Sequence, residues 1–158
     1  MAGATAAIAA LTRTKATFSL HEYAHSAGAS YGEEAAEALG IDPARMYKTL
    51  VVDGGGRLAV GVVPVAGSLD LKAMAAALRI KSVRMADAAD AERATGYVVG
   101  GISPLGQRKQ LPTVIDESVM TWPTVFVSAG RRGLQVECEP AALVSLTRAT
   151  LAPIGRLG

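Results

Sequence analysis

Residues 96–107 read Gly-Tyr-Val-Val-Gly-Gly-Ile-Ser-Pro-Leu-Gly-Gln, and the interpretation of the whole chain starts from this stretch. The short apolar run 97–99 predicts a buried strand, and the glycines and Pro104 that follow predict a loop. Because glycine has no Cβ, the N–H groups of Gly100 and Gly101 can approach a ligand oxygen that a bulkier residue would exclude. The alternative left open by these residues is a tight turn between strands.

Outward from this stretch, helices and strands alternate irregularly along the chain. Apolar spacing and capping residues predict helices over 4–15, 31–39, 42–47, 70–79, 87–95 and 140–150. Period-two alternation and turn residues predict strands over 17–23, 48–52, 57–63, 81–85, 111–115, 124–128 and 134–138. This order predicts an α/β (α+β) fold in which helices surround a mixed, partly antiparallel sheet or an irregular barrel, rather than a doubly wound fold.

Length and composition limit the classes of protein to consider. The chain has 158 residues, of which 50% are hydrophobic, so we expect residues 1–158 to form a single domain. The formal net charge of +2 permits a phosphate-bearing partner without requiring one. Cys138 is the single cysteine, which suits a reducing compartment. No cationic leader or membrane-spanning run is evident, so we expect a cytoplasmic protein without a membrane partner.

Two nucleotide or metal motifs match the sequence in part. Residues 21–25 spell His-Glu-Tyr-Ala-His, which is the H-E-x-x-H pattern of zinc peptidases. That pattern requires a helix, whereas residues 17–23 alternate like a strand, and Tyr31 occupies the third histidine position of a metzincin. Residues 101–106 have the glycine spacing of a Walker A loop, but Gln107 and Arg108 replace its lysine and hydroxyl residue. We therefore expect neither a metal nor another cofactor, although a carboxylate completing a zinc site stays an alternative.

Few side chains suggest a catalytic role by themselves. Lys48 stands at the start of the apolar strand 48–52, where a surface lysine is the ordinary alternative. Residues 128–133 form a polar turn, Ser-Ala-Gly-Arg-Arg-Gly, for which a solvated hairpin is the ordinary alternative. Cys138 follows an alternating apolar run and is expected to be a buried, inert thiol. An acyl-transfer reaction would therefore depend on backbone N–H groups and a lysine.

Taken together, these stretches resemble the YbaK family of bacterial Cys-tRNA(Pro) deacylases, which are related to the editing domain inserted in prolyl-tRNA synthetases. The resemblance extends from residue 18 to about residue 147 and is carried by residues 20–23, 31–36, 48–50, 85–87, 95–107 and 128–134. It implies a mixed α/β fold whose sheet closes into an irregular barrel around a pocket for the charged 3′ end of tRNA.

The resemblance also assigns expected roles to residues of this chain. The catalytic positions of the family fall on Lys48, Gly100 and Gly101. The expected substrate-binding residues are Tyr23, Tyr31, Thr49, Ser103, Ser128 and Gly130. Tyr31 stands where some members have phenylalanine, and Ala129 stands where glycine is frequent. Neither departure removes a group that the chemistry needs.

The function implied by the resemblance is trans-editing of mischarged tRNA. The first hypothesis is a hydrolase for Cys-tRNA(Pro) in which the thiol of the substrate attacks its own ester. One alternative is a deacylase for alanine or serine on tRNA. The other is a non-catalytic module that binds tRNA or a synthetase. The expected partners are the 3′ end of aminoacyl-tRNA and prolyl-tRNA synthetase.

Overall fold

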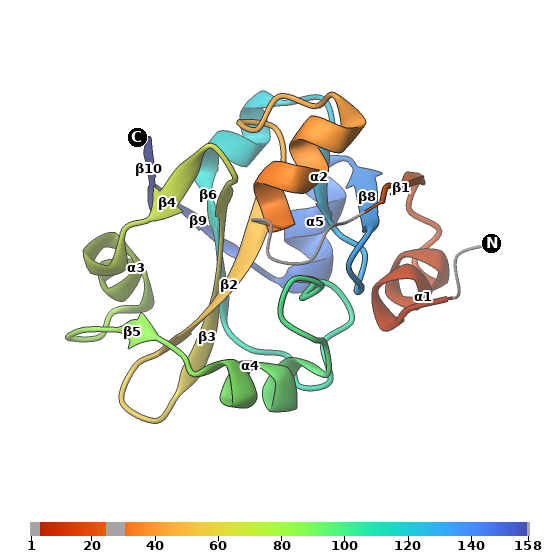
Figure 1. Cartoon of the computed structure of the whole chain (residues 1–158). Helices are drawn as coiled ribbons and strands as arrows, with labels where there is room; N and C mark the ends of the chain where they lie inside the picture. The colour runs from red at the N-terminus through yellow and green to blue at the C-terminus, as the bar shows by residue number, and fades with distance from the viewer. Residues whose placement is uncertain (1–3, 25–30, 158) are drawn as a thin grey trace.

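The structure is a computed structural model, and it describes residues 4–24 and 31–157 (Figure 1). The helices are α1 (Ala6–Arg13), α2 (Tyr31–Leu39), α3 (Leu71–Leu78), α4 (Ala88–Thr95), α5 (Pro140–Thr147) and the 3₁₀ helix η1 (Glu117–Thr121). The strands are β1 (Phe18–Glu22), β2 (Tyr47–Asp53), β3 (Leu58–Pro64), β4 (Gly67–Leu69), β5 (Arg84–Met85), β6 (Thr113–Asp116), β7 (Val125–Ser128), β8 (Leu134–Cys138), β9 (Thr150–Ala152) and β10 (Gly155–Leu157). Within the described ranges, no helix is long and apolar enough to cross a bilayer.

The strands form a mixed central sheet and two smaller sheets. The central sheet has the order β5-β2-β3-β6-β9, with antiparallel pairing of β2 to β3 and β5 and parallel pairing of β6 to β3 and β9. The sheet β1-β8-β7 and the pair β10-β4 are antiparallel. The prediction of a mixed, partly antiparallel sheet is confirmed. The barrel alternative is wrong for the described strands. The central sheet and the β1-β8-β7 sheet are not joined by a continuous strand ladder, and an isolated β-bridge links Met46 to Phe126.

The central sheet is buried on both faces, which explains its continuous apolar strands. On one face Ala59 and Val63 pack in a cluster with Met74 of α3. On the other face Val60 and Val62 join a larger cluster that includes residues of α1, α5 and the β1-β8-β7 sheet. Figure 1 shows the same order, with α3 on one side of β2 and β3 and with β8, β1 and α1 on the other.

The predicted β2–β3 hairpin and the capped helix α3 are confirmed. Asp53 accepts a hydrogen bond from the N–H of Gly56 at 2.7 Å, and Gly54 donates to the carbonyl of Arg57 at 2.8 Å. Asp70 caps α3 by accepting from the N–H of Ala73 at 3.1 Å. These turn and cap contacts could be predicted from the sequence because each joins residues that are no more than three positions apart.

The predicted strand over 97–99 is wrong, because this segment is part of a loop folded back on α4. Gly96 ends α4 in the left-handed conformation, with φ of 82°. Tyr97 is buried, but Val98 is 59% exposed. The side chain of Glu92 accepts from the N–H of Val99 at 2.8 Å. The carboxylate of Glu92, one turn before the end of α4, therefore accepts the hydrogen bond that the Val99 N–H would have donated to a neighbouring strand.

The other corrections also concern short elements. The predicted helix over 42–47 is a turn, in which Asp42 accepts from the N–H of Ala44 at 2.9 Å, and β2 begins at Tyr47. Strand pairing buries Tyr47 and so outcompetes the helix signal of Pro43. The strand expected over 81–85 is confirmed only at Arg84–Met85. Helix α5 ends at Arg148 in the left-handed region, with φ of 55°, and is followed by β9 and β10, which the sequence did not predict.

Tyr97 anchors the loop that follows α4, and its removal tests that role. Its hydroxyl donates to the carbonyl oxygen of Leu105 at 2.6 Å, and burial raises the pKa of Tyr97 to about 12, so the hydroxyl keeps its proton at neutral pH. Tyr97→Phe leaves a buried carbonyl without a donor and is expected to lower the free energy of unfolding by about 1–3 kcal/mol. Chemical denaturation measures this loss.

The matched control is Val98→Ala, because Val98 is exposed in the same loop. This change is expected to alter stability by less than about 0.5 kcal/mol. Equal losses for the two variants would show that the hydroxyl of Tyr97 does not anchor the loop.

Candidate functional site

A pocket of about 370 Å³ lies among α2, β2, the segment from β5 to α4, the loop after α4 and the β7–β8 pair. Its size lies within the range of small-molecule sites in proteins. Met46, Leu50 and Met85 contribute apolar surface. Six of the nine residues that the sequence predicted for the site line this pocket, namely Tyr23, Tyr31, Lys48, Thr49, Gly100 and Ser128.

The other three predicted residues, Gly101, Ser103 and Gly130, pack behind the pocket wall. A Cβ on Gly101 would lie 2.7 Å from the Cα of Arg131, and a Cβ on Gly130 would lie 2.8 Å from the ring of Tyr97. Ser103 is fully buried, and its hydroxyl accepts from the N–H of Leu105 at 3.1 Å. These contacts hold together the loop 96–107 and the turn 128–133. The three residues therefore pack beneath the pocket lining and do not form part of it.

Lys48 brings a positive charge to the pocket. It lies near the start of β2, opposite Val63 of β3, and it is half-buried. Its ammonium group has no hydrogen bond or ion pair with residues 4–24 or 31–157. A cation on a rigid strand with no carboxylate partner is suited to bind an anionic or strongly dipolar oxygen of a ligand.

Two buried polar atoms of residues that line the pocket have no hydrogen-bond partner among residues 4–24 and 31–157. The hydroxyl oxygen of Thr49 and the side-chain carbonyl oxygen of Gln135 are both buried without a hydrogen bond. Buried polar atoms are ordinarily paired, since an unpaired one costs about 1–3 kcal/mol. Because Thr49 and Gln135 line the pocket, they are candidates to contact a polar group of a ligand.

Gln135 is a site residue that the sequence analysis missed. It lies on β8 between the buried residues Leu134 and Val136, and its register partners are Ser128 on β7 and His21 on β1. Gln135 and Glu137 alternate with the apolar residues of β8, so a polar residue at position 135 gave no signal of a pocket. Only the pairing with Ser128, itself a predicted residue, places it in the pocket.

The glycine loop, residues 96–107, contributes Val99, Gly100 and Ile102 to the pocket lining, and its backbone N–H groups differ in whether they are already paired. The N–H of Val99 donates to Glu92 at 2.8 Å, and the N–H of Gly101 donates to the carbonyl of Val98 at 2.8 Å. The N–H of Gly100 has no acceptor in the described part of the chain. Of the two glycines that the sequence indicated, only Gly100 therefore has a donor free for a ligand.

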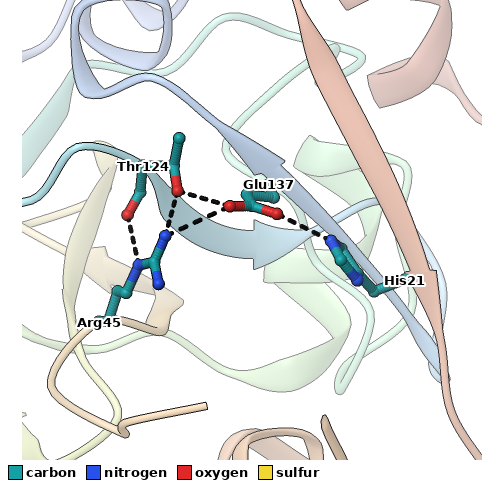
Figure 2. Close-up of polar contacts among 4 residues, drawn as sticks. All are labelled: His21, Arg45, Thr124 and Glu137. Atoms are coloured by element: carbon teal, nitrogen blue, oxygen red, sulfur yellow. Dashed lines mark hydrogen bonds and ion pairs between the residues drawn. The ribbon is translucent and has the colours of Figure 1, made fainter. Parts of the chain in front are cut away.

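A polar cluster beside the pocket joins the β1-β8-β7 sheet to the start of β2 (Figure 2). Glu137 accepts from the hydroxyl of Thr124 at 2.6 Å, from His21 at 3.0 Å and from Arg45 at 3.3 Å. The Thr124 hydrogen bond, followed by His21 and Arg45, holds the pKa of Glu137 below its ordinary value despite partial burial. Arg45 also donates to the carbonyl of Thr124 at 2.7 Å.

His21 belongs to this cluster and lies on strand β1, as its alternating neighbours predicted. Its ring centroid is 5.2 Å from that of Phe126. His25, the second histidine of the H-E-x-x-H pattern, lies outside the described residues. No group of three potential metal ligands occurs within the ranges that the structure covers.

Cys138 does not line the pocket. The residue is 1% exposed, and burial raises the pKa of its thiol to about 11, with smaller contributions from Glu137 and Glu139. A buried thiol that stays protonated at neutral pH is a poor nucleophile. The geometry therefore offers a cation, a backbone donor and polar acceptors, with no activated cysteine beside them.

A family model described as "Aminoacyl-tRNA editing domain" matches residues 25–146, which include both walls of the pocket. The chain belongs to this aminoacyl-tRNA editing family. The match covers Tyr31, Lys48, Gly100 and Gln135, so every lining residue except Tyr23 lies within the part of the chain that matches the family.

Individual relatives of the editing family extend this comparison. The chain is 41% identical over 141 residues to a protein of Enterococcus faecalis (strain ATCC 700802 / V583) named "Putative Cys-tRNA(Pro)/Cys-tRNA(Cys) deacylase EbsC", covering 89% of this chain and 86% of the relative. It is 29% identical over 112 residues to YwhH of Bacillus subtilis (strain 168), covering 70% of this chain and 71% of the relative.

A solved structure described as "Crystal structure of a putative trans-editing enzyme for prolyl tRNA synthetase" has the same fold. Its TM-score is 0.83 at 27% identity, and the comparison covers 94% of this chain and 93% of the other.

Replacing Gln135 tests whether it is kept for a ligand or for the fold. Gln135→Leu has a similar size and removes a buried acceptor that lacks a partner, so thermal unfolding is expected at an equal or higher temperature. Ser103→Ala is the control, because it removes the buried acceptor of the Leu105 N–H and is expected to cost about 1–3 kcal/mol. A comparable loss of stability in Gln135→Leu would assign Gln135 a structural role.

Proposed function

We propose that this chain is a trans-editing hydrolase that deacylates mischarged tRNA, with Cys-tRNA(Pro) as the preferred substrate. The observation that carries the proposal is that one pocket brings together the ammonium of Lys48, the N–H of Gly100 and the side-chain oxygens of Thr49 and Gln135. None of these groups has a hydrogen-bond partner within the part of the chain that the structure describes. Family membership and the names of the relatives support the same substrate class.

The proposed roles follow from the charge of each group. Lys48 holds a phosphate or ribose oxygen at the 3′ end of the tRNA, because it brings a positive charge to the lining and has no ion pair among the described residues. The N–H of Gly100 donates to the ester carbonyl oxygen, where negative charge develops during acyl transfer. The hydroxyl of Thr49 and the amide oxygen of Gln135 hold polar groups of the terminal aminoacyl-nucleotide.

The nucleophile in this proposal is the thiol of the substrate. The cysteine sulfur attacks its own ester carbonyl, a C–S bond forms, and the C–O bond to the ribose breaks. The thiol proton ends on the released ribose oxygen, and cysteine leaves as a cyclic thiolactone. An intramolecular thiol has a high effective concentration, so the protein needs only to fold the substrate and stabilise the oxyanion. A buried Cys138 with a raised pKa is consistent with a nucleophile that comes from the substrate.

Other members of the same class of reaction stay as alternatives. Removal of alanine or serine would use the same cation and backbone donor, with water as the nucleophile. A non-catalytic module that binds tRNA or prolyl-tRNA synthetase is the alternative from another class. The partnership with prolyl-tRNA synthetase is a proposal supported by the similarity to the solved trans-editing protein. Turnover on a panel of tRNA(Pro) charged with cysteine, alanine or serine separates these functions.

Lys48→Ala tests the role of the cation. The change is expected to reduce kcat/KM by at least about 100-fold, because it removes a charge-assisted contact to the tRNA end. Its thermal stability should stay close to that of the unmodified chain, since the ammonium has no partner among the described residues. Deacylation of Cys-tRNA(Pro) under saturating and subsaturating conditions provides the measurement.

The control for this charge change is Lys72→Ala, at an exposed position on α3. It is expected to retain normal turnover. Unaltered kcat/KM in Lys48→Ala would remove Lys48 from the site.

Comparison of the cysteine and serine esters tests the source of the nucleophile. A few per cent of cysteine thiols are ionised at neutral pH and essentially no serine hydroxyls are, so the serine ester is expected to react on the order of 100-fold more slowly. Each rate is expressed relative to spontaneous hydrolysis of the same tRNA without protein. Cys138→Ala should keep a near-normal rate on the cysteine ester. Rapid turnover of the serine ester, or a folded but inactive Cys138→Ala, would assign the attack to water or to the protein.

A further inference from the structure

The glycine loop has a backbone conformation in which one peptide unit can face either of two ways. The N–H of Gly101 donates to the carbonyl of Val98 at 2.8 Å, which closes a four-residue turn over 98–101. Gly100 is the third residue of this turn and has φ of 92°, the conformation that characterises a type II turn. A type I turn has the same closing hydrogen bond, but its central peptide is rotated by about half a turn.

The central peptide joins Val99 to Gly100, so its orientation determines the direction of the Gly100 N–H. The carbonyl and the N–H of one trans peptide point in opposite directions. In a type II turn here, the carbonyl of Val99 faces one side and the N–H of Gly100 faces the other. Rotation to the type I form would exchange these directions and present a carbonyl oxygen where the donor had been.

Arg132 holds the carbonyl side of this peptide. Its Nε and one terminal nitrogen donate to the carbonyl oxygen of Val99 at 2.9 and 2.7 Å. The guanidinium carbon lies 4.8 Å from the centre of the Tyr31 ring, so the ring supports the plane of the group from one side. Arg132 is therefore fixed by Tyr31 and by two hydrogen bonds to the same oxygen.

The Val99–Gly100 peptide borders the pocket. Val99 and Gly100 belong to the lining, as does Tyr31, whereas Arg132 does not. With the Val99 carbonyl turned toward Arg132, the N–H of Gly100 is directed away from the guanidinium. This N–H has no acceptor in the described part of the chain.

We propose that Arg132 is a positioning residue that locks the Val99–Gly100 peptide in the orientation that directs the Gly100 N–H at the ester oxygen of the substrate. This inference rests on the proposed function and identifies the side chain on which its oxyanion donor depends. Arg132 acts through the peptide and does not contact the reacting atoms. Tyr31, expected from the sequence to lie near the substrate, has a second role as the platform for the guanidinium.

The neighbouring Arg131 provides a matched control, because it has the same charge but different contacts. Arg131 is exposed, and its guanidinium lies 3.9 Å from Glu22. Nonspecific attraction of tRNA phosphates would depend on either arginine. Orientation of the peptide would depend on Arg132 alone.

Kinetics of single variants separate these roles. Arg132→Ala and Arg132→Lys are expected to lower kcat by about 10- to 100-fold with little change in KM, because loss of an oriented oxyanion donor typically costs about 100-fold or more. Lysine keeps the charge but cannot donate two hydrogen bonds in one plane. Arg131→Ala is expected to keep kcat. A raised KM with unchanged kcat in Arg132→Ala, or full rescue by lysine, would overturn the inference in favour of a charge contact to tRNA.

A double variant tests whether Arg132 acts through Gly100. A Cβ on Gly100 would lie 2.8 Å from Nε of Arg132 and 2.9 Å from the Tyr31 ring, and a side chain disfavours positive φ. Gly100→Ala should therefore lose the same orientation by another route. The double variant is expected to be within about threefold of the slower single variant, because the two changes remove one interaction. Losses that multiply would show independent roles and contradict the inference.

An NMR measurement tests the orientation without any substrate. In a type II turn the Hα of Val99 and the amide proton of Gly100 lie close together, and they separate when the peptide rotates. The nuclear Overhauser effect between them is expected to be strong in the unmodified chain and in Arg131→Ala, and weak in Arg132→Ala. A strong signal in Arg132→Ala overturns the inference whether or not the chain deacylates tRNA. An unmodified chain inactive on every charged tRNA overturns the proposed function separately.

Discussion

The pocket depends on the carboxylate of Glu137, which joins the two sheets that form its walls. One wall is β2, with Lys48 and Thr49, and the other is the β7–β8 pair. Between these walls the backbone contributes the isolated bridge of Met46 and Phe126, and Glu137 contributes its ion pair with Arg45, whereas its hydrogen bonds to Thr124 and His21 lie on its own side (Figure 2). A charge-assisted hydrogen bond is directional, so the Arg45 contact adds a preferred geometry to the apolar packing that also joins the walls.

Under the proposed mechanism, the groups of the pocket would select a substrate by its reactivity more than by the size of its side chain. An apolar pocket distinguishes side chains of similar size by only about 10- to 200-fold. A site that supplies a cation and an oriented backbone donor, and leaves the nucleophile to the substrate, accelerates the ester that carries its own thiol. The protein then needs rigid positioning more than an activated residue, and the buried thiol of Cys138 agrees with that requirement.

Much of the fold could be predicted from local signals, and the site only in part. The β2–β3 hairpin and the cap at Asp70 were predictable because their hydrogen bonds join residues close in sequence. Strand β9 was missed because its pairing with β6 is set by distant residues. Gln135 was missed because its place opposite Ser128 depends on strand register. Gly101 was expected among the catalytic residues, as a backbone donor, but its N–H closes a turn, a detail that residue type alone does not specify.

Identification of the first product released from Cys-tRNA(Pro) tests the proposed mechanism most directly. In a single-turnover reaction followed by mass spectrometry, attack by the substrate thiol should release cysteine thiolactone in step with free tRNA, and free cysteine should form only afterwards. Free cysteine as the first product, with no thiolactone at any time while tRNA is released, would contradict the mechanism.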